Sequence, residues 1–255
     1  MKIKSVKAWL EHLPLTKPYT IAYKTITDTE IVFFEVELDN GITGIGASNP
    51  FSAVVPETPA DTFINLQAGF VQQFAGRDIR HFNQLIDESL IQFPQLPGTL
   101  AAIDIALHDA FGKWLGIPIV DLYGRKINAL PTSITIGIKD TAEMLEEARA
   151  NYAAGFKIIK IKTGHHAEED IERVTKLTEE FGGKMKIRVD ANKGYDIHQL
   201  KYFLDKTNHL SIELVEQPLP VAKENDLLLL TAEQSKLLAA DESLIDPLSA
   251  MQHAH

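Results

Sequence analysis

Three acidic residues that each close a short apolar run are the chemically most informative feature of this sequence. Asp190 ends KIRVD, Glu216 ends SIELVE and Asp241 ends LLAAD. The intervals, 190 to 216 and 216 to 241, are about the length that one strand, one crossover helix and two short loops occupy in a βαβ unit. Parallel strands of a β/α barrel point their carboxyl ends toward one rim, so the spacing predicts that the three carboxylates converge.

The donor types of these acids favour a magnesium site. Carboxylate oxygens without Cys or His are the ligands that Mg²⁺ prefers. Taken singly, Asp190 is equally consistent with a loop or capping aspartate, which is the more common role of an acid after a strand. The regular spacing of all three acids favours the ligand role. Glu242, next to Asp241, is the alternative third ligand.

Two lysines lie one repeat upstream, in KIIKIKTG. Lys160 and Lys162 are two positions apart on an expected strand and therefore project from the same face. A neighbouring cation and a divalent metal disfavour the charged form of a lysine, so we expect lowered pKa values that suit a general base. The combination predicts removal of a proton next to a carboxylate, with the metal neutralising the charge that develops. The alternative is an ordinary polar strand face.

Composition restricts the class of protein. The chain has 255 residues, a formal net charge of −10 and no cysteine. The negative charge argues against nucleic acid and anionic membranes as partners, and the absence of Cys excludes disulfides, zinc–thiolate sites and cysteine nucleophiles. No run of 18 apolar residues and no signal peptide is present in the sequence. These features predict a cytoplasmic protein.

The pattern of elements predicts an α/β protein with two domains, 1–128 and 129–255. In the first, the alternating segment 31–38 meets Asp-Asn-Gly, a strong hairpin signal, and helical periodicity follows over 60–125. This indicates an α+β capping domain. From about residue 130, strand and helix patterns alternate through five β/α repeats, one of which has its helix in ENDLLLLTAEQSK.

A closed barrel needs eight repeats, typically over ~250 residues, so the second domain is expected to be an incomplete barrel. The sequence stops at AMQHAH in what reads as an uncapped helix, a pattern that predicts a truncated coding sequence. Two further patterns favour structural roles. Gly44 and Gly46 belong to no nucleotide-binding motif and predict a strand that another element approaches closely. The histidines at 165–166 and 253–255 have no third ligand at matching spacing and are expected on the surface.

Five motifs in this order resemble the enolase superfamily, and specifically its mandelate racemase and muconate-lactonising subgroup. They are AAIDIALHDAFGKWLG, KIKTG, VDANKGY, VEQPL and ADES, and the resemblance covers essentially the whole chain. Within the subgroup, LPLTKPYTIAYKT and TSITIGI look most like dipeptide epimerases. The resemblance implies an isomerase that abstracts an α-proton from a dipeptide or a related carboxylate.

The resemblance also implies individual roles. The expected Mg²⁺ ligands are Asp190, Glu216 and Asp241. Lys162 would be the base on one face of the substrate, and Lys160 its electrostatic partner beside the substrate carboxylate.

Further residues are implied in substrate binding. Thr135 and Asn192 would line the pocket, and the loop 19–26 would close over the substrate. Lys24 in that loop would meet an acidic or carboxyl-bearing group.

Two features of the subgroup have no counterpart in this sequence. They are a second lysine on the sixth barrel strand and an Asp-x-Asp pair on the eighth, which holds the substrate ammonium in dipeptide epimerases. Epimerisation needs an acid and a base on opposite faces of the α-carbon, so we expect impaired activity. Two alternatives stay open: an enzyme like muconate cycloisomerase or o-succinylbenzoate synthase, and a non-catalytic fragment. An open sheet edge would favour association with other chains, including a homo-oligomer.

Overall fold

The computed structural model describes residues 1–253, which form two compact units. The first comprises Met1–Thr16 and Asp28–Asn128, and the second comprises Lys17–Thr27 and the chain from Ala129 onward. The segment Lys17–Thr27, which contains the turn between the first two strands, therefore belongs with the second unit, whereas the sequence pattern places it in the capping domain.

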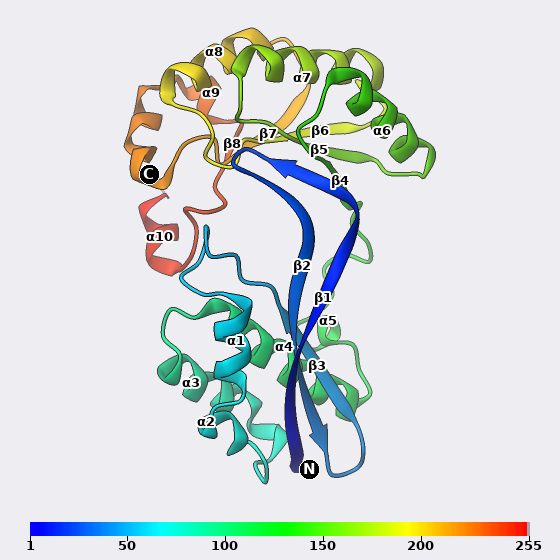
Figure 1. The fold of residues 1–255 in the computed structure, drawn as a ribbon, viewed down its shortest axis with the longest axis vertical. Coiled ribbons are helices and arrows are strands. Elements are labelled where there is room, and N and C mark those ends of the chain that lie inside the picture. The colour runs from blue at the N-terminus through cyan, green and yellow to red at the C-terminus, as the bar shows by residue number, and fades with distance from the viewer. Residues whose placement is uncertain (254–255) are drawn as a thin grey trace. The chain divides into compact units, whose positions relative to one another are not determined.

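The first unit is built on a three-stranded sheet in the order β1-β2-β3 (Figure 1). Its strands are β1 (Ile3–Ile21), β2 (Lys24–Leu38) and β3 (Thr43–Ser48). Its helices are α1 (Pro59–Leu66), α2 (Gly69–Gln72), η1 (Ile79–His81), α3 (Phe82–Gln92), α4 (Pro97–Leu115) and α5 (Ile119–Leu122). Strands β2 and β3 are antiparallel and joined through Asp-Asn-Gly, with Gly41 at a φ of 83°, as the hairpin signal predicts.

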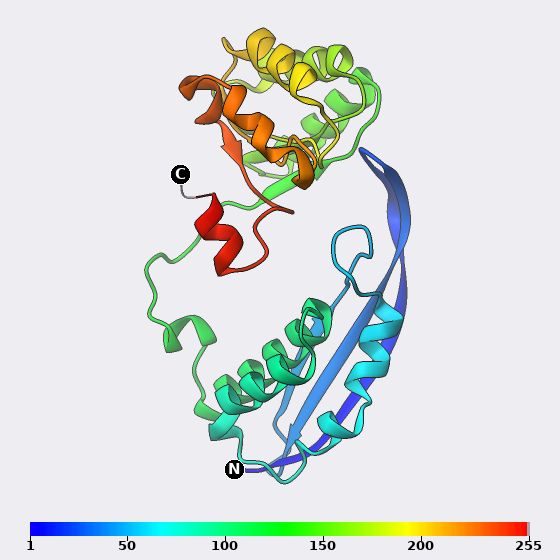
Figure 2. The ribbon, with the colours of Figure 1, turned by 90° about the vertical axis from the view of Figure 1, so that its left-hand side faces the viewer.

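Helix α4 packs directly on β3 (Figure 2). A Cβ atom at Gly46 would lie 1.9 Å from the carbonyl oxygen of Ala102, and one at Gly44 would lie 2.3 Å from that of Ala106. Only glycine permits this approach, so the prediction of a closely approached strand is confirmed. The small residues of α4 that face β3 are themselves fully buried.

The second unit is a five-stranded parallel sheet in sequential order, as five β/α repeats predict. Its strands are β4 (Ser133–Ile136), β5 (Ile158–Lys162), β6 (Lys186–Asp190), β7 (Ile212–Glu216) and β8 (Leu238–Ala239). The helical segments are α6 (Thr141–Ala153), α7 (Ala167–Phe181), α8 (Ile197–Thr207), η2 (Val221–Leu229), α9 (Ala232–Ser235) and α10 (Pro247–Gln252). The incomplete barrel is thus confirmed.

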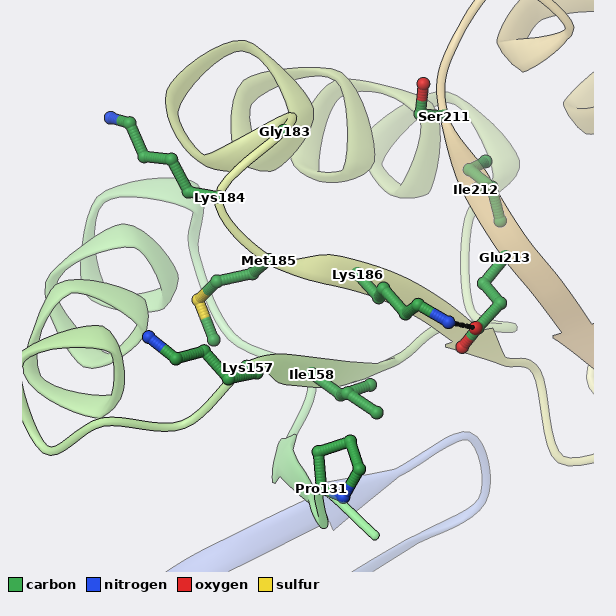
Figure 3. Close-up of a pocket in the computed structure, with 10 residues that line it drawn as sticks. All are labelled: Pro131, Lys157, Ile158, Gly183, Lys184, Met185, Lys186, Ser211, Ile212 and Glu213. Carbon is green, nitrogen blue, oxygen red and sulfur yellow. Dashed lines mark hydrogen bonds and ion pairs between the residues drawn. The ribbon is translucent and has the colours of Figure 1, made fainter.

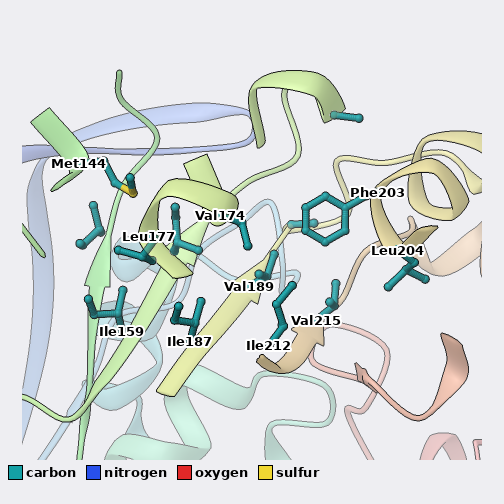
Figure 4. Close-up of a cluster of buried hydrophobic side chains, with 14 of the residues drawn as sticks. Met144, Ile159, Val174, Leu177, Ile187, Val189, Phe203, Leu204, Ile212 and Val215 are labelled. Atoms are coloured by element: carbon teal, nitrogen blue, oxygen red, sulfur yellow. The ribbon is translucent and has the colours of Figure 1, made fainter. Parts of the chain in front are cut away.

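Helices α6, α7 and α8 cover one face of this sheet, and the core lies between them and the strands (Figure 4). Ile159 and Ile187 alternate with polar residues along β5 and β6, and Val215 on β7 precedes Glu216; all three apolar side chains are fully buried. Leu177 and Phe203 meet them from α7 and α8. Period-two alternation in the strands therefore sends the apolar side chains to the helices and the chemical groups to the other face.

The prediction of one continuous helix in ENDLLLLTAEQSK is wrong. The segment forms the 3₁₀ helix η2, and the single-turn helix α9 follows. Leu230 between them is extended, with a φ of −83° and a ψ of 155°. The Thr231 side chain then caps α9 by accepting a hydrogen bond from the backbone of Gln234, so a new helix begins instead of the old one continuing. The uncapped terminal helix is also not observed, because α10 ends at Gln252 with His253 as its C-cap.

Candidate active site

The candidate site lies at the carboxyl ends of β5, β6 and β7, within the second unit. Lys162, Asp190 and Glu216 are the last residues of these strands, and the sheet register pairs Lys162 with Asp190 and Asp190 with Glu216. Their adjacency follows from the parallel pairing, because every strand ends at the same edge. Lys162 is 7% exposed and Asp190 is fully buried.

Both lysines donate to the acids at this edge. Lys160 Nζ lies 2.8 Å from Asp190 Oδ2 and 2.7 Å from Glu216 Oε1. Lys162 Nζ lies 2.6 Å from the same Asp190 Oδ2 and 2.7 Å from Asn192 Oδ1. The other oxygen of Asp190 accepts a hydrogen bond of 3.0 Å from the Asn192 backbone. Asp190 is therefore the centre of a hydrogen-bonded cluster that includes both lysines and Asn192.

The charges of this cluster correct one expectation. Burial lowers the pKa of Lys160, but its hydrogen bonds and ion pairs with Asp190 and Glu216 outweigh burial, so the pKa of Lys160 is raised. The expected lowering is wrong for this residue because its nearest charged partners are carboxylates rather than a second cation. Burial likewise raises the pKa of Asp190, and the two lysines more than compensate, so that carboxyl has a lowered pKa.

Glu216 shows the opposite balance. Burial raises its pKa; Lys160 counters this effect, while the negative charges of Asp190 and Asp241 reinforce it, and the net pKa is raised. The three acids of the sequence pattern are thus close enough for their charges to interact. The positive charge of Lys160 does not fully offset the burial and the neighbouring negative charges that disfavour ionised Glu216. Asp241 is exposed and lies two residues beyond β8.

A divalent cation fits these residues by their chemistry. The edge offers three carboxylates, and an ammonium group already bridges two of them. Within residues 1–253, no three His, Asp or Glu side chains are arranged together as a set of metal ligands. The roles of Asp190, Glu216 and Asp241 as ligands therefore stay predictions.

Gln217 is a residue of this edge that the sequence pattern did not single out. Its φ is 34°, in the left-handed region, directly after Glu216. Its side-chain oxygen accepts hydrogen bonds from the backbone of Asp241 at 2.9 Å and of Ser243 at 3.2 Å, and its amide nitrogen donates to Glu224 at 3.1 Å. Gln217 therefore joins the loops after β7 and β8 and fixes the backbone at Asp241.

Lys193, Tyr23 and Glu242 form a second group that was not identified as a unit. Lys193 Nζ lies 3.6 Å from Glu242 Oε1 and 5.7 Å from the ring centroid of Tyr23. Burial, then the charges of Glu242, Asp190 and Asp241, raise the pKa of Tyr23. The Glu242 side chain is 5% exposed and pairs with Lys193. Asp241, for which Glu242 is the alternative third ligand, is exposed. Aromatic and charged pairs far apart in sequence leave no periodic signal.

The remaining predicted residues are placed as follows. Thr135 on β4 is the register partner of Lys160 and is half-buried at the same edge region. Lys24 is exposed at the start of β2, and its substrate-binding role stays a prediction. His165 and His166 are exposed, as expected, and His253 pairs with Glu224 at 3.0 Å; His255 lies outside the described residues.

Comparison with known families agrees with this fold. Residues 4–124 match the N-terminal domain of mandelate racemase / muconate lactonizing enzyme, and residues 143–255 match the enolase C-terminal domain-like model. The fold and these matches define an enzyme of the enolase superfamily. The chain belongs to the mandelate racemase / muconate lactonizing enzyme family.

Individual relatives are more informative about chemistry. The chain is 46% identical over all 255 residues to an L-Lys-D/L-Arg epimerase of Desulforapulum autotrophicum and spans 72% of its length. A crystal structure of the dipeptide epimerase from Methylococcus capsulatus, complexed with Mg and L-Arg-D-Lys, superposes with a TM-score of 0.94 at 38% identity, covering 99% of this chain and 71% of that one. The Enterococcus faecalis dipeptide epimerase, complexed with Mg and L-Leu-L-Tyr, has a TM-score of 0.91 at 31% identity and similar coverage.

These relatives are epimerases, so the chain is of the isomerase class by family. The resemblance to dipeptide epimerases inferred from the sequence motifs is thus confirmed. Among the described residues, no helix combines the length and apolar character needed to cross a bilayer.

Proposed function

We propose that this chain carries out Mg²⁺-assisted removal of the α-proton from the C-terminal residue of a dipeptide, the first half of an epimerisation. One observation supports this proposal above the others: Lys162 Nζ lies at the sheet edge between Asp190 and Asn192, at 2.6 and 2.7 Å. The two acceptors fix the position of Nζ, and the neutral amine, which still has two hydrogens to donate to them, presents its lone pair as a general base requires.

The residues that would hold the ion are Asp190, Glu216 and Asp241. Bound there, Mg²⁺ would neutralise negative charge on the substrate carboxylate and make the neighbouring proton more acidic. The raised pKa of Glu216 supports this assignment, because burial and the neighbouring acids leave its carboxylate short of positive charge.

Each lysine has a distinct role in the proposal. Lys162 accepts the proton at Nζ, and Asn192 Oδ1 orients that atom by accepting one of its hydrogens. Lys160, whose ammonium group pairs with Asp190 and Glu216, supplies positive charge beside the substrate carboxylate. In this proposal Thr135, the register partner of Lys160 on β4, would line the substrate pocket.

Dipeptides with Lys or Arg side chains are the substrate class that we propose. Two relatives, at 46% and 38% identity, are L-Lys-D/L-Arg epimerases. The net charge of −10 on this chain also favours the approach of cationic substrates.

The test is α-proton exchange with solvent, which needs only one base. The 255-residue protein is incubated in D₂O with Mg²⁺ and each of L-Lys-L-Arg, L-Arg-L-Lys, L-Ala-L-Glu and L-Leu-L-Tyr, and loss of the C-terminal α-proton signal is followed by NMR. We expect exchange that EDTA abolishes, fastest with the cationic dipeptides.

Two outcomes would contradict parts of the proposal. Exchange with L-Leu-L-Tyr but not with cationic dipeptides would refute the substrate class and leave the reaction standing. No exchange with any of the four would refute the reaction itself for this chain.

A further inference from the structure

A buried ion pair lies in the first turn of α7, outside the cluster of lysines and acids. Asp170 is fully buried and Arg173 is 3% exposed, and the guanidinium Nη2 donates to Asp170 Oδ1. Removing such charges from water is costly, and the proposed reaction does not use either residue directly.

Asp170 holds two loops that follow neighbouring strands. Its Oδ2 accepts a hydrogen bond of 2.9 Å from the backbone of Gly164, two residues after Lys162 at the end of β5. The same oxygen accepts a hydrogen bond of 2.7 Å from the hydroxyl of Tyr195, in the loop after β6. Tyr195 is 2% exposed, and burial, followed by the charge of Asp170, raises its pKa, so the hydroxyl remains a donor.

Arg173 extends the connection to a third loop. Its Nη1 donates to the backbone oxygen of Lys139, three residues after β4, at 3.0 Å. The pair Asp170–Arg173 therefore connects one helix turn to the loops after β4, β5 and β6.

The loops after β5 and β6 are pressed against each other. Gly164 has a φ of 101°, and a Cβ atom there would lie 2.4 Å from the backbone oxygen of Ala191. A Cβ atom at Gly194 would lie 2.3 Å from the oxygen of Gly164. The backbone N–H of Thr163, between Lys162 and Gly164, donates to the backbone carbonyl oxygen of Asp190 at 2.9 Å. A shift of Gly164 would therefore move the backbone next to both Lys162 and Asp190.

We infer that Asp170 is a positioning residue: by holding Gly164 and Tyr195, it keeps the ammonium group of Lys162 in place against Asp190 and Asn192. The inference rests on the proposed function for its effect on rate, but its effect on Lys162 is independent of catalysis. Rigid support of this kind matters because a misplacement of about 1 Å costs on the order of 10²-fold in rate.

The opposite end of the sheet supplies a matched control. A cavity of about 550 Å³ lies at the amino ends of β5, β6 and β7, where Lys186 Nζ is 2.5 Å from Glu213 Oε1 (Figure 3). Arg188 also binds Glu213, at 2.6 Å. Glu213→Gln thus removes an ion-paired carboxylate from the same sheet without touching the proposed site.

The experiment compares Asp170→Asn, Tyr195→Phe and Glu213→Gln with the unchanged protein, at a temperature where circular dichroism shows all four to be folded. Lysines are labelled with limiting acetic anhydride and quantified by mass spectrometry, and the α-proton exchange of L-Lys-L-Arg is measured in parallel. In Asp170→Asn, one of the two acceptor oxygens becomes an NH₂ donor that must face either Arg173 or the Gly164 and Tyr195 donors, so the network that holds the Gly164 loop is weakened.

We expect labelling of Lys162 to rise at least threefold in Asp170→Asn and less in Tyr195→Phe, which keeps the Gly164 and Arg173 contacts. Glu213→Gln should raise labelling of Lys186 and leave Lys162 unchanged. The kcat for exchange should fall on the order of 10²-fold in Asp170→Asn with little change in KM.

Unchanged Lys162 labelling and unchanged kcat in folded Asp170→Asn would overturn the inference and leave the proposed function intact. If the unchanged protein shows no exchange, the proposed function fails, and the labelling of Lys162 still decides whether Asp170 positions it. Equal rises in labelling at Lys162 and Lys186 in Asp170→Asn would indicate general loosening and would also overturn the inference.

Discussion

Lys160 on β5 reaches Glu216 on β7 with its Nζ 2.7 Å from Oε1, although β6 lies between the two strands. The contact is direct because the inward side chains of a curved parallel sheet converge, and Asp190 on β6 shares the same ammonium group at 2.8 Å. One cationic group is thus held by acids from two strands. Lys162, the proposed base, contacts the same Asp190 oxygen at 2.6 Å, so the proposed metal position and the proposed base belong to one electrostatic unit.

Replacement of Lys162 by methionine should remove α-proton exchange while leaving Mg²⁺ binding in place. General base catalysis typically contributes about 10²–10⁴-fold to a reaction rate, so we expect the exchange rate to fall by at least about 10²-fold. Calorimetric titration with Mg²⁺ should show binding in both proteins. The matched control is Lys157→Met, at an exposed residue of the same segment, which should keep the original rate. Full exchange in Lys162→Met would assign the base elsewhere.

Stabilisation by Mg²⁺ should depend on pH through Glu216. The pKa of Glu216 is raised in the folded protein. Its contribution to stability is therefore fully present when the pH is below its ordinary pKa of 4.5, and this contribution is lost as the pH rises through the raised pKa. Ionised Glu216 therefore costs stability at neutral pH, and a bound cation offsets that cost. We expect the Tm increase on adding Mg²⁺ to be largest near pH 8 and to decline as the pH falls through the raised pKa.

Glu216→Gln provides the comparison for this pH dependence. Its amide does not ionise, so the Tm without Mg²⁺ should rise at pH 8, and the increase on adding Mg²⁺ should shrink. At 100 times the dissociation constant a ligand stabilises a protein by about 2.7 kcal/mol, which is measurable by scanning calorimetry. An Mg²⁺ effect that grows as the pH falls would contradict the assignment of Glu216 as a ligand.

The sequence predicts the convergence at this edge because parallel strands have a fixed direction. Two spacings are sufficient to place four side chains close together: the one-repeat spacing of Asp190 and Glu216, and the two-residue spacing of Lys160 and Lys162. The predicted direction of the Lys160 pKa shift was wrong because it depends on which carboxylate the amine contacts, and sequence spacing does not determine rotamers.

The parts that were missed depend on the loops. Gln217 and Lys193 have positive φ without being glycine, and neither propensity nor periodicity predicts such a conformation. The break at Leu230 was missed because the leucine-rich segment is compatible with helix, while Thr231 starts a separate capped turn. Contacts such as that of Lys193 with Tyr23 span most of the chain and become visible only after folding.

Gly46→Ala should strongly destabilise the first unit. The added Cβ would meet the backbone oxygen of Ala102 at 1.9 Å, so α4 must shift; overpacking typically costs about 1–3 kcal/mol or more. Both tryptophans, Trp9 and Trp114, belong to this unit, so their fluorescence in a urea titration reports on it. The control is Gly69→Ala, where nothing lies within 4 Å, and we expect a small gain of about 0.4–1 kcal/mol. Equal midpoints for the two variants would contradict the close packing of α4 on β3.

Arg173→Met should destabilise the second unit by leaving a buried carboxylate without its cation. Asp170 is fully buried, and breaking such a pair by removing one partner typically costs about 3–5 kcal/mol. Urea unfolding followed by far-ultraviolet circular dichroism measures the loss. A second substitution, Asp170→Asn, should restore part of the stability, because no unpaired charge then remains in the interior. A double variant less stable than Arg173→Met would contradict the prediction. It would mean that the hydrogen bonds that Asp170 accepts from Gly164 and Tyr195 stabilise the fold by more than its unpaired charge costs.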